Sequence, residues 1–201
     1  MQTHSQKRIL WHVGTVVLSV LSHVSAHAIE VNPTAKEIQA ALNEGKQAAE
    51  KKRSPESFYE RFGVSDAVHP KGHLVTKLGG LSVMATHMAL RGREPSQADV
   101  AQILESKTML VSTVILGETP NFAVDSYIVL EQDGKAIKPV TVRFDAQAEH
   151  SAVWPMSPKF KAKVVAWFNY ADFDPMAVTT ITVYPATGGD ASFVVKFLDM
   201  H

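Results

Sequence analysis

Histidines and methionines gather in one stretch of the chain, HPKGHLVTKLGGLSVMATHM, which spans residues 69–88. Imidazole nitrogens bind zinc and copper, and thioether sulfurs favour copper. His69 and His73 have the i, i+4 spacing that would place two imidazoles on one face of a helix. Pro70 and Gly72 lie between them and disfavour a helix. We therefore expect this pair to belong to a turn.

A second group, Met84, His87 and Met88, has helical spacing and could hold copper in an oxidising compartment. Leu81 and Ala85 form an apolar stripe with the two methionines, which is the pattern of an ordinary core helix in which methionine fills gaps. We therefore expect structural roles and assign no metal ligand.

Two further stretches could do chemistry. Asp172, Asp174 and Asn169 offer oxygens in a strand connection, but calcium takes about six to eight ligands. Aspartates that bond their own backbone in a turn are the simpler interpretation.

The segment around Ser82, Gly80-Leu81-Ser82-Val83-Met84, lacks the second glycine of a nucleophile elbow, and no predicted strand precedes it. We assign no catalytic and no cofactor-binding residue.

The N-terminus has the features of a secretory signal over residues 1–28. Lys7 and Arg8 supply its positive charge, Val13 to Val24 is apolar, and Ala26-His27-Ala28 has the small-x-small cleavage pattern. The apolar run is too short to span a bilayer, which takes about 20 residues. We expect a mature chain that begins near Ile29, is soluble after export and has no membrane span after cleavage.

The composition favours some cellular compartments and some classes of partner over others. The chain has no cysteine, which fits a bacterial periplasm or secretion better than a route in which small domains carry disulfides. Its 20 Lys and Arg residues balance its 20 Asp and Glu residues. A chain with no net charge has no global field for nucleic acid, and we expect no nucleic-acid partner.

Short helices are predicted for residues 29–106. One predicted helix spans Thr34 to about Arg53 and begins with a capping box of Thr34 and Glu37. Another spans Ser96 to Leu104 and begins with a capping box of Ser96 and Asp99. The remaining two predicted helices span 54–63, with Ser54 as cap and Pro55 in the first turn, and Thr76 to Leu90.

Residues 107–201 change to the period of two that is typical of strands. The predicted strands are 109–116, 126–131, 136–144, 160–170, 179–184 and 192–198, and Asp133-Gly134 and Gly188-Gly189-Asp190 mark hairpins. These strands predict an antiparallel β-sandwich, immunoglobulin-like or similar. The fold class is thus α+β, with short N-terminal helices packed on a C-terminal sandwich.

The connector Trp154-Pro155-Met156-Ser157-Pro158 precedes the longest predicted strand and could expose an apolar anchor for a partner, as could Phe173 and Met176. We therefore expect an exported, non-catalytic binding or assembly module that contacts a protein or cell-envelope partner, or a second copy of itself. One alternative is a periplasmic metal-handling protein that uses His69, His73 and His87. Another is an uncharacterised hydrolase with a site between the two halves.

Overall fold

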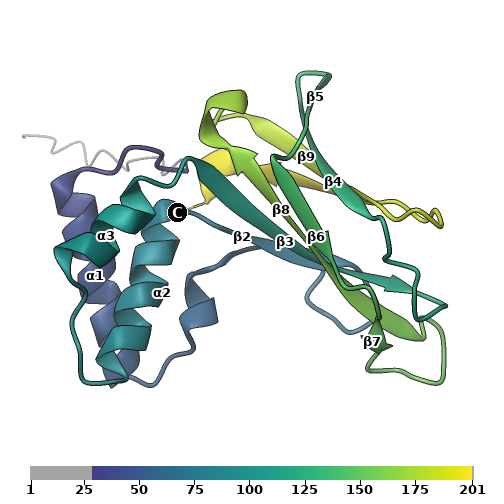
Figure 1. Cartoon of the computed structure of the whole chain (residues 1–201), viewed down its shortest axis with the longest axis horizontal. Helices are drawn as coiled ribbons and strands as arrows, with labels where there is room; N and C mark the ends of the chain where they lie inside the picture. Colours follow the sequence, from purple (N-terminus) through teal and green to yellow (C-terminus); the bar gives the residue numbers. More distant parts are fainter. Residues whose placement is uncertain (1–28, 201) are drawn as a thin grey trace, which may run out of the picture.

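The computed structural model describes residues 29–200, in which three α-helices lie beside two antiparallel sheets (Figure 1). The helices gather at one end of the sheets, and β7 lies toward the other end. The α-helices are α1 (Ala35–Glu50), α2 (Lys77–Ala89) and α3 (Gln97–Leu104), and the 3-10 turns are η1 (Pro55–Phe58), η2 (Tyr170–Asp172) and η3 (Phe197–Asp199). The strands are β1 (Glu60–Gly63), β2 (Lys71–Val75), β3 (Thr108–Gly117), β4 (Tyr127–Gln132), β5 (Lys135–Ile137), β6 (Thr141–Phe144), β7 (Glu149–His150), β8 (Phe160–Asn169), β9 (Val178–Tyr184) and β10 (Ala191–Lys196).

Local caps set where the helices begin. The Thr34 hydroxyl accepts from the Glu37 amide, and the Glu37 carboxylate accepts from the Thr34 amide at 2.7 Å. Ser96 and Asp99 form the same box at the start of α3. Each box satisfies two amides that the first helical turn leaves without a partner. Both predicted capping boxes are confirmed.

Small residues bring α1 and α2 into close contact. A Cβ atom added to Gly45 would lie 2.3 Å from the Ser82 carbonyl oxygen and 2.7 Å from the Ala85 Cβ. The Ser82 hydroxyl donates to the Ala41 carbonyl at 3.0 Å, and the Thr86 hydroxyl donates to the Gly45 carbonyl at 3.0 Å. The backbones of the two helices therefore lie close together, and hydroxyl side chains of α2 hydrogen-bond to backbone carbonyls of α1.

The two sheets pack face to face as a sandwich. The large sheet has the order β1-β2-β3-β8-β6, with β7 also paired to β8, and the small sheet has the order β10-β9-β4-β5. Large apolar side chains from both sheets fill the space between them; those with no exposed surface include Met109, Val111, Ile128, Leu130, Val164, Phe168 and Ile181. The predicted α+β fold class is confirmed.

Two predicted elements differ from the structure. The helix predicted over 54–63 is wrong, because only η1 is helical there and β1 follows it as a strand paired with β2. Burial of Phe62 in the core outweighs the local helix signals of Ser54 and Pro55. The single strand predicted over 136–144 is also wrong. Pro139 separates β5, in the small sheet, from β6, in the large one.

The large sheet takes two strands, β1 and β2, from the region that we expected to be helical. The predicted hairpin at Asp133-Gly134 joins β4 to β5, and the one at 188–190 joins β9 to β10. The predicted signal, residues 1–28, lies outside the described residues. From residue 29 to 200, every helix is too short or too polar to cross a bilayer.

Candidate functional site

The three histidines considered as metal ligands lie on separate elements. His69 is exposed in the loop before β2, where its Nδ1 lies 2.6 Å from an Asp66 carboxylate oxygen. His73 lies on β2, half-buried, with its ring stacked 4.5 Å from that of Tyr59. The turn predicted for the pair is therefore wrong for His73, because residues 71–75 pair with β1 and β3 as a strand. His87 is exposed in the last turn of α2. Among residues 29–200, no three His, Asp or Glu side chains are placed to hold one metal ion.

The methionines of the second group lie on the same helix, α2. Met84 and Met88 are half-buried, whereas Leu81 and Ala85 are buried. The apolar stripe predicted for a core helix is therefore present. The metal-handling alternative stays a prediction for which the described geometry offers no assembled ligand set.

The aspartates after β8 are engaged in local bonds. Asp172 accepts from the Asn169 side-chain amide at 3.1 Å, and Asp174 accepts from the Met176 backbone amide at 2.8 Å. The side chain of Gln132, on β4, accepts a hydrogen bond from the Asp174 backbone amide and donates one to the Asp174 carbonyl. These contacts are those of a turn fixed to the small sheet. The neighbouring Phe173 is buried in the core and is not an exposed anchor, whereas Met176 is exposed.

Ser82 has a structural position. Its side chain is buried between α1 and α2, where its hydroxyl donates to the Ala41 carbonyl. A nucleophilic serine needs a neighbouring base and access to substrate. Ser82 therefore serves the contact between the helices.

A depression of about 470 Å³ lies where the helices meet the sandwich, lined among others by Lys77, Glu105 and Tyr170. The Lys77 ammonium donates to the Leu104 carbonyl at 2.6 Å and lies 5.4 Å from the centre of the Tyr170 ring. Burial lowers the pKa of Lys77 and raises the pKa of Tyr170 to about 12. Lys77 thus bonds the last turn of α3, and these contacts join the helices to η2, the turn that follows β8.

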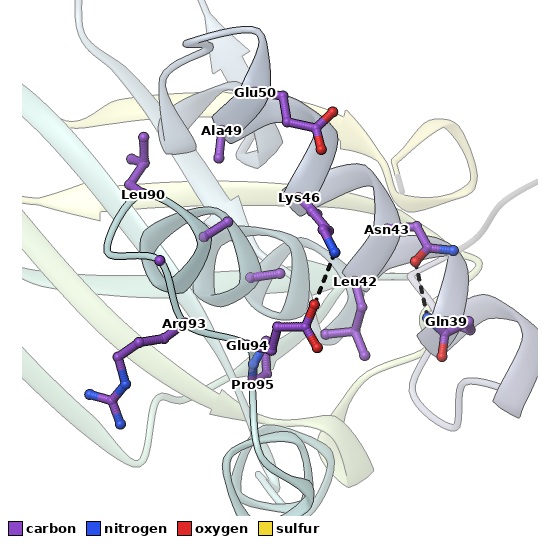
Figure 2. A pocket seen from close by; sticks show the side chains of 13 residues that line it. Gln39, Leu42, Asn43, Lys46, Ala49, Glu50, Leu90, Arg93, Glu94 and Pro95 are labelled. Carbon is purple, nitrogen blue, oxygen red and sulfur yellow. Dashed lines mark hydrogen bonds and ion pairs between the residues drawn. The ribbon is translucent and has the colours of Figure 1, made fainter.

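A groove of about 670 Å³ runs between α1 and α2 and is bounded by the segment after α2 (Figure 2). Ala85, Ala89 and Leu42 contribute apolar surface to it. Lys46 of α1 and Glu94 form an ion pair of 2.9 Å across it. This contact raises the pKa of Lys46 and lowers that of Glu94. The sequence did not predict this groove, since neither helix alone indicates which face meets the other.

The connector of residues 154–158, the Trp154 connector, exposes two large apolar side chains. Trp154 is 51% exposed and Met156 is 67% exposed. The Trp154 ring stacks 4.5 Å from that of His150. The connector is also bonded at both ends. At its start the Trp154 amide donates to the Ser151 carbonyl at 3.3 Å. At its end the Ser151 hydroxyl donates to the Pro158 carbonyl, and the Ser157 hydroxyl donates to Glu118 at 2.6 Å. The exposed apolar groups are therefore held in a defined loop.

Comparison with protein-family models and with curated protein sequences gives no match. Several solved structures show limited similarity, among them the following three. The archaellum periplasmic stator protein FlaG from Sulfolobus acidocaldarius aligns at 13% identity and a TM-score of 0.31, over 45% of this chain and 88% of that one. The IgNAR antibody domain C1 aligns at 12% identity and a TM-score of 0.31, over 51% and 84%. The stator complex FlaF and FlaG from the same organism aligns at 15% identity and a TM-score of 0.30, over 45% and 78%. Similarity at this level does not indicate a function.

Proposed function

We propose that this chain is an exported, non-catalytic binding module that docks a protein partner through the Trp154 connector. The observation that carries the proposal is an exposed tryptophan, 51% accessible, held in a loop that is bonded at both ends. Tryptophan is one of the side chains enriched among residues that dominate binding energy at protein interfaces. A loop fixed before binding loses less conformational entropy when it docks.

The position of the connector suits a contact with another molecule. It follows β7, toward the end of the sandwich remote from the helices (Figure 1). Met156 adds a flexible apolar side chain next to Trp154, and methionine adapts to the shape of a partner surface. Export is part of the proposal and rests on the features of residues 1–28 described above.

Photo-crosslinking from position 156 in the native compartment tests the proposal. We expect a defined protein neighbour to be trapped, and we expect Trp154→Ala to weaken that complex at least about tenfold, as at interface hot spots. Val194→Ala is the matched control, because Val194 is 73% exposed on the outer face of the small sheet. It should leave the complex intact.

Thermal unfolding of each variant separates docking from stability. Trp154→Ala removes a half-exposed side chain and should change the melting temperature by only a few degrees. If crosslinking traps no partner, or if Trp154→Ala and Val194→Ala weaken the complex equally, the connector is not the docking site and the proposal fails.

A further inference from the structure

The outer face of the large sheet carries a concentration of basic side chains. Along β8, Ala162, Val164, Ala166 and Phe168 are buried against the small sheet, so the alternate residues face outward. Lys161 and Lys163 are exposed, whereas Val165 and Trp167 are half-buried. This strand therefore presents two ammonium groups followed by two apolar side chains.

Strand register places further basic residues beside these. Val165 lies opposite Arg143 of β6 on one side and Ser112 of β3 on the other, and Ser112 lies opposite His73. His73 in turn lies opposite Arg61 of β1. One row thus crosses five strands, with the members Arg61, His73, Ser112, Val165 and Arg143. The next row contains Lys71, Val114 and Lys163.

We call this surface the basic face and define it by Arg61, Lys71, His73, Arg143, Lys161 and Lys163. Three carboxylates lie near it, and one of them is Glu56, whose charge acts on His73. Glu149 pairs with Lys161 at 3.2 Å, and Asp145, at the end of β6, accepts from the Lys163 backbone amide at 2.7 Å. The basic side chains outnumber these carboxylates, in a chain whose formal net charge is zero. A local excess of positive charge on a neutral molecule attracts anionic groups to that side.

Spacing decides what kind of anion would fit. Neighbouring strands lie about 4.8 Å apart, so the row from Arg61 to Arg143 spans roughly 19 Å. Cations so far apart do not converge on one phosphate or one carboxylate. Val165 and Val114 lie between them, and the Arg143 guanidinium lies 5.5 Å from the centre of the Trp167 ring. An extended chain with both acidic and apolar side chains would match both features of this face.

We propose that the basic face binds an extended acidic segment of a partner protein, with its carboxylates on Arg61, Arg143 and Lys163 and its apolar side chains on Val114, Val165 and Trp167. Arginine donates two parallel hydrogen bonds to a carboxylate, which fixes the orientation of such a segment. This surface is distinct from the Trp154 connector, so the inference does not depend on the proposed function.

His73 lies inside the basic face and reports on its charge. Burial lowers the pKa of His73, and the positive charges of Lys163 and Arg61 lower it further, while Glu56 acts in the opposite direction. The positive charge that opposes protonation of His73 is the same charge that would attract an acidic segment. Carboxylates bound beside Lys163 and Arg61 would offset that charge and raise the pKa of His73.

The probe is a fluorescein-labelled peptide of about 10 residues in which glutamate and valine alternate at every second position, with serine at the positions between them. In an extended conformation both kinds of side chain then lie on one side of the peptide, which is long enough to cross the row. Fluorescence anisotropy at low salt measures its binding to the mature protein. The triple variant Arg61→Gln, Arg143→Gln, Lys163→Gln should bind about tenfold more weakly, as expected for three exposed charge pairs. The matched control, Lys36→Gln, Lys51→Gln, Lys135→Gln, removes three exposed lysines elsewhere and should bind as the unmodified protein does.

An NMR titration of His73 in the unmodified protein gives a second measurement that needs no variant. We expect its pKa to rise when the peptide is bound, and to stay unchanged with a peptide in which lysine replaces glutamate. The proposal is overturned if the acidic peptide does not bind, if both triple variants weaken binding equally, or if the pKa of His73 does not move. It is also overturned if heparin or DNA binds this face and the acidic peptide does not displace it. Trp154→Ala should leave peptide binding unchanged, so the two proposals can fail separately.

Discussion

The helix pair and the sandwich are held together by different means. The core between the sheets contains large side chains such as Phe168, Phe197 and Leu130, and no residue of α1, α2 or α3 belongs to that cluster. Across the contact of α1 with α2, the buried residues of α1 are Ala41, Gly45 and Ala48. The sandwich buries large apolar surfaces, whereas the helices bring their backbones close.

This difference predicts different stabilities. Burial of apolar surface contributes about 25 cal/mol for each Å², so small side chains contribute little and large ones contribute most. The helix pair depends instead on close packing and on hydroxyl-to-carbonyl hydrogen bonds, each with a net contribution of about 1 kcal/mol. We therefore expect the helices to open locally at a lower free energy than the sandwich.

The largest effect should come from the centre of the sandwich. Phe168 has no exposed surface, and Phe168→Ala should lower the free energy of unfolding by about 3 to 5 kcal/mol because it removes that burial and leaves a cavity. Urea denaturation followed by circular dichroism measures the loss. Val194→Ala, on the exposed face of the small sheet, should change stability by less than about 0.5 kcal/mol. If Phe168→Ala also lowered the free energy of unfolding by less than about 0.5 kcal/mol, the burial of Phe168 described above would be contradicted.

A change at Gly45 should disturb the helix pair alone. Gly45→Val would place side-chain atoms against the Ser82 carbonyl and force the helices apart, at a cost of about 1 to 3 kcal/mol. Hydrogen exchange should accelerate in 35–50 and 77–89 while β8 stays protected. Ala40→Val, at an exposed position of α1, is the control for helix propensity. If it accelerates exchange equally, the close approach of the helices is not what stabilises them.

Much of the fold could be predicted from the sequence because its signals are local. The capping boxes that begin at Thr34 and Ser96, the hairpin at Asp133-Gly134 and the alternation along β8 each depend on residues close in the chain. The region 54–63 was predicted wrongly because its conformation depends on pairing with β2 and on burial of Phe62. The sequence of residues 54–63 alone does not indicate that they pair with β2 or that Phe62 is buried in the core.

The candidate surfaces differ in the same way. The Trp154 connector was recognisable, since its tryptophan, methionine and prolines are adjacent in the sequence. The basic face was not, because its members come from β1, β2, β6 and β8 and are aligned only by strand register. The alternation of Lys161 and Lys163 was a visible part of it. Nothing local indicates that Arg61 and Arg143 lie in one row.

A smaller effect is expected from the hydrogen bond of Thr86, which has its side chain buried between α1 and α2. Its hydroxyl donates to the Gly45 carbonyl and lies 2.8 Å from the Ser82 carbonyl. Thr86→Val keeps the shape and removes the donor, so we expect a loss of about 1 to 2 kcal/mol in urea denaturation. Exchange should again accelerate in the helix pair and not in β8. An unchanged stability would mean that packing alone holds the helices.

The smallest expected effect is a pH dependence that arises in the large sheet and not in the helix pair. The pKa of His73 is lowered from 6.5 in the folded protein, so the unfolded chain binds this proton more readily. Its contribution to stability is fully present above about pH 6.5 and declines as pH falls from there toward the folded pKa, by about 1.4 kcal/mol for each unit between the two values. The lowered pKa values of Asp66, Glu94 and Asp99 act at lower pH, because the ordinary pKa values of these carboxyls are already only 3.8 to 4.5.

Urea denaturation at about pH 7.5 and about pH 5.5 therefore isolates His73 from the carboxyl groups. The unmodified protein should lose stability between these two conditions, and His73→Gln should lose less, because glutamine takes up no proton. His87→Gln is the matched control for replacing a histidine, since His87 lies at an exposed position of α2. Equal pH dependence in His73→Gln and the unmodified protein would mean that protonation of His73 costs nothing in the folded state. In that case the positive charges of Arg61 and Lys163 do not act on the ring between them, and the electrostatic description of the basic face is wrong.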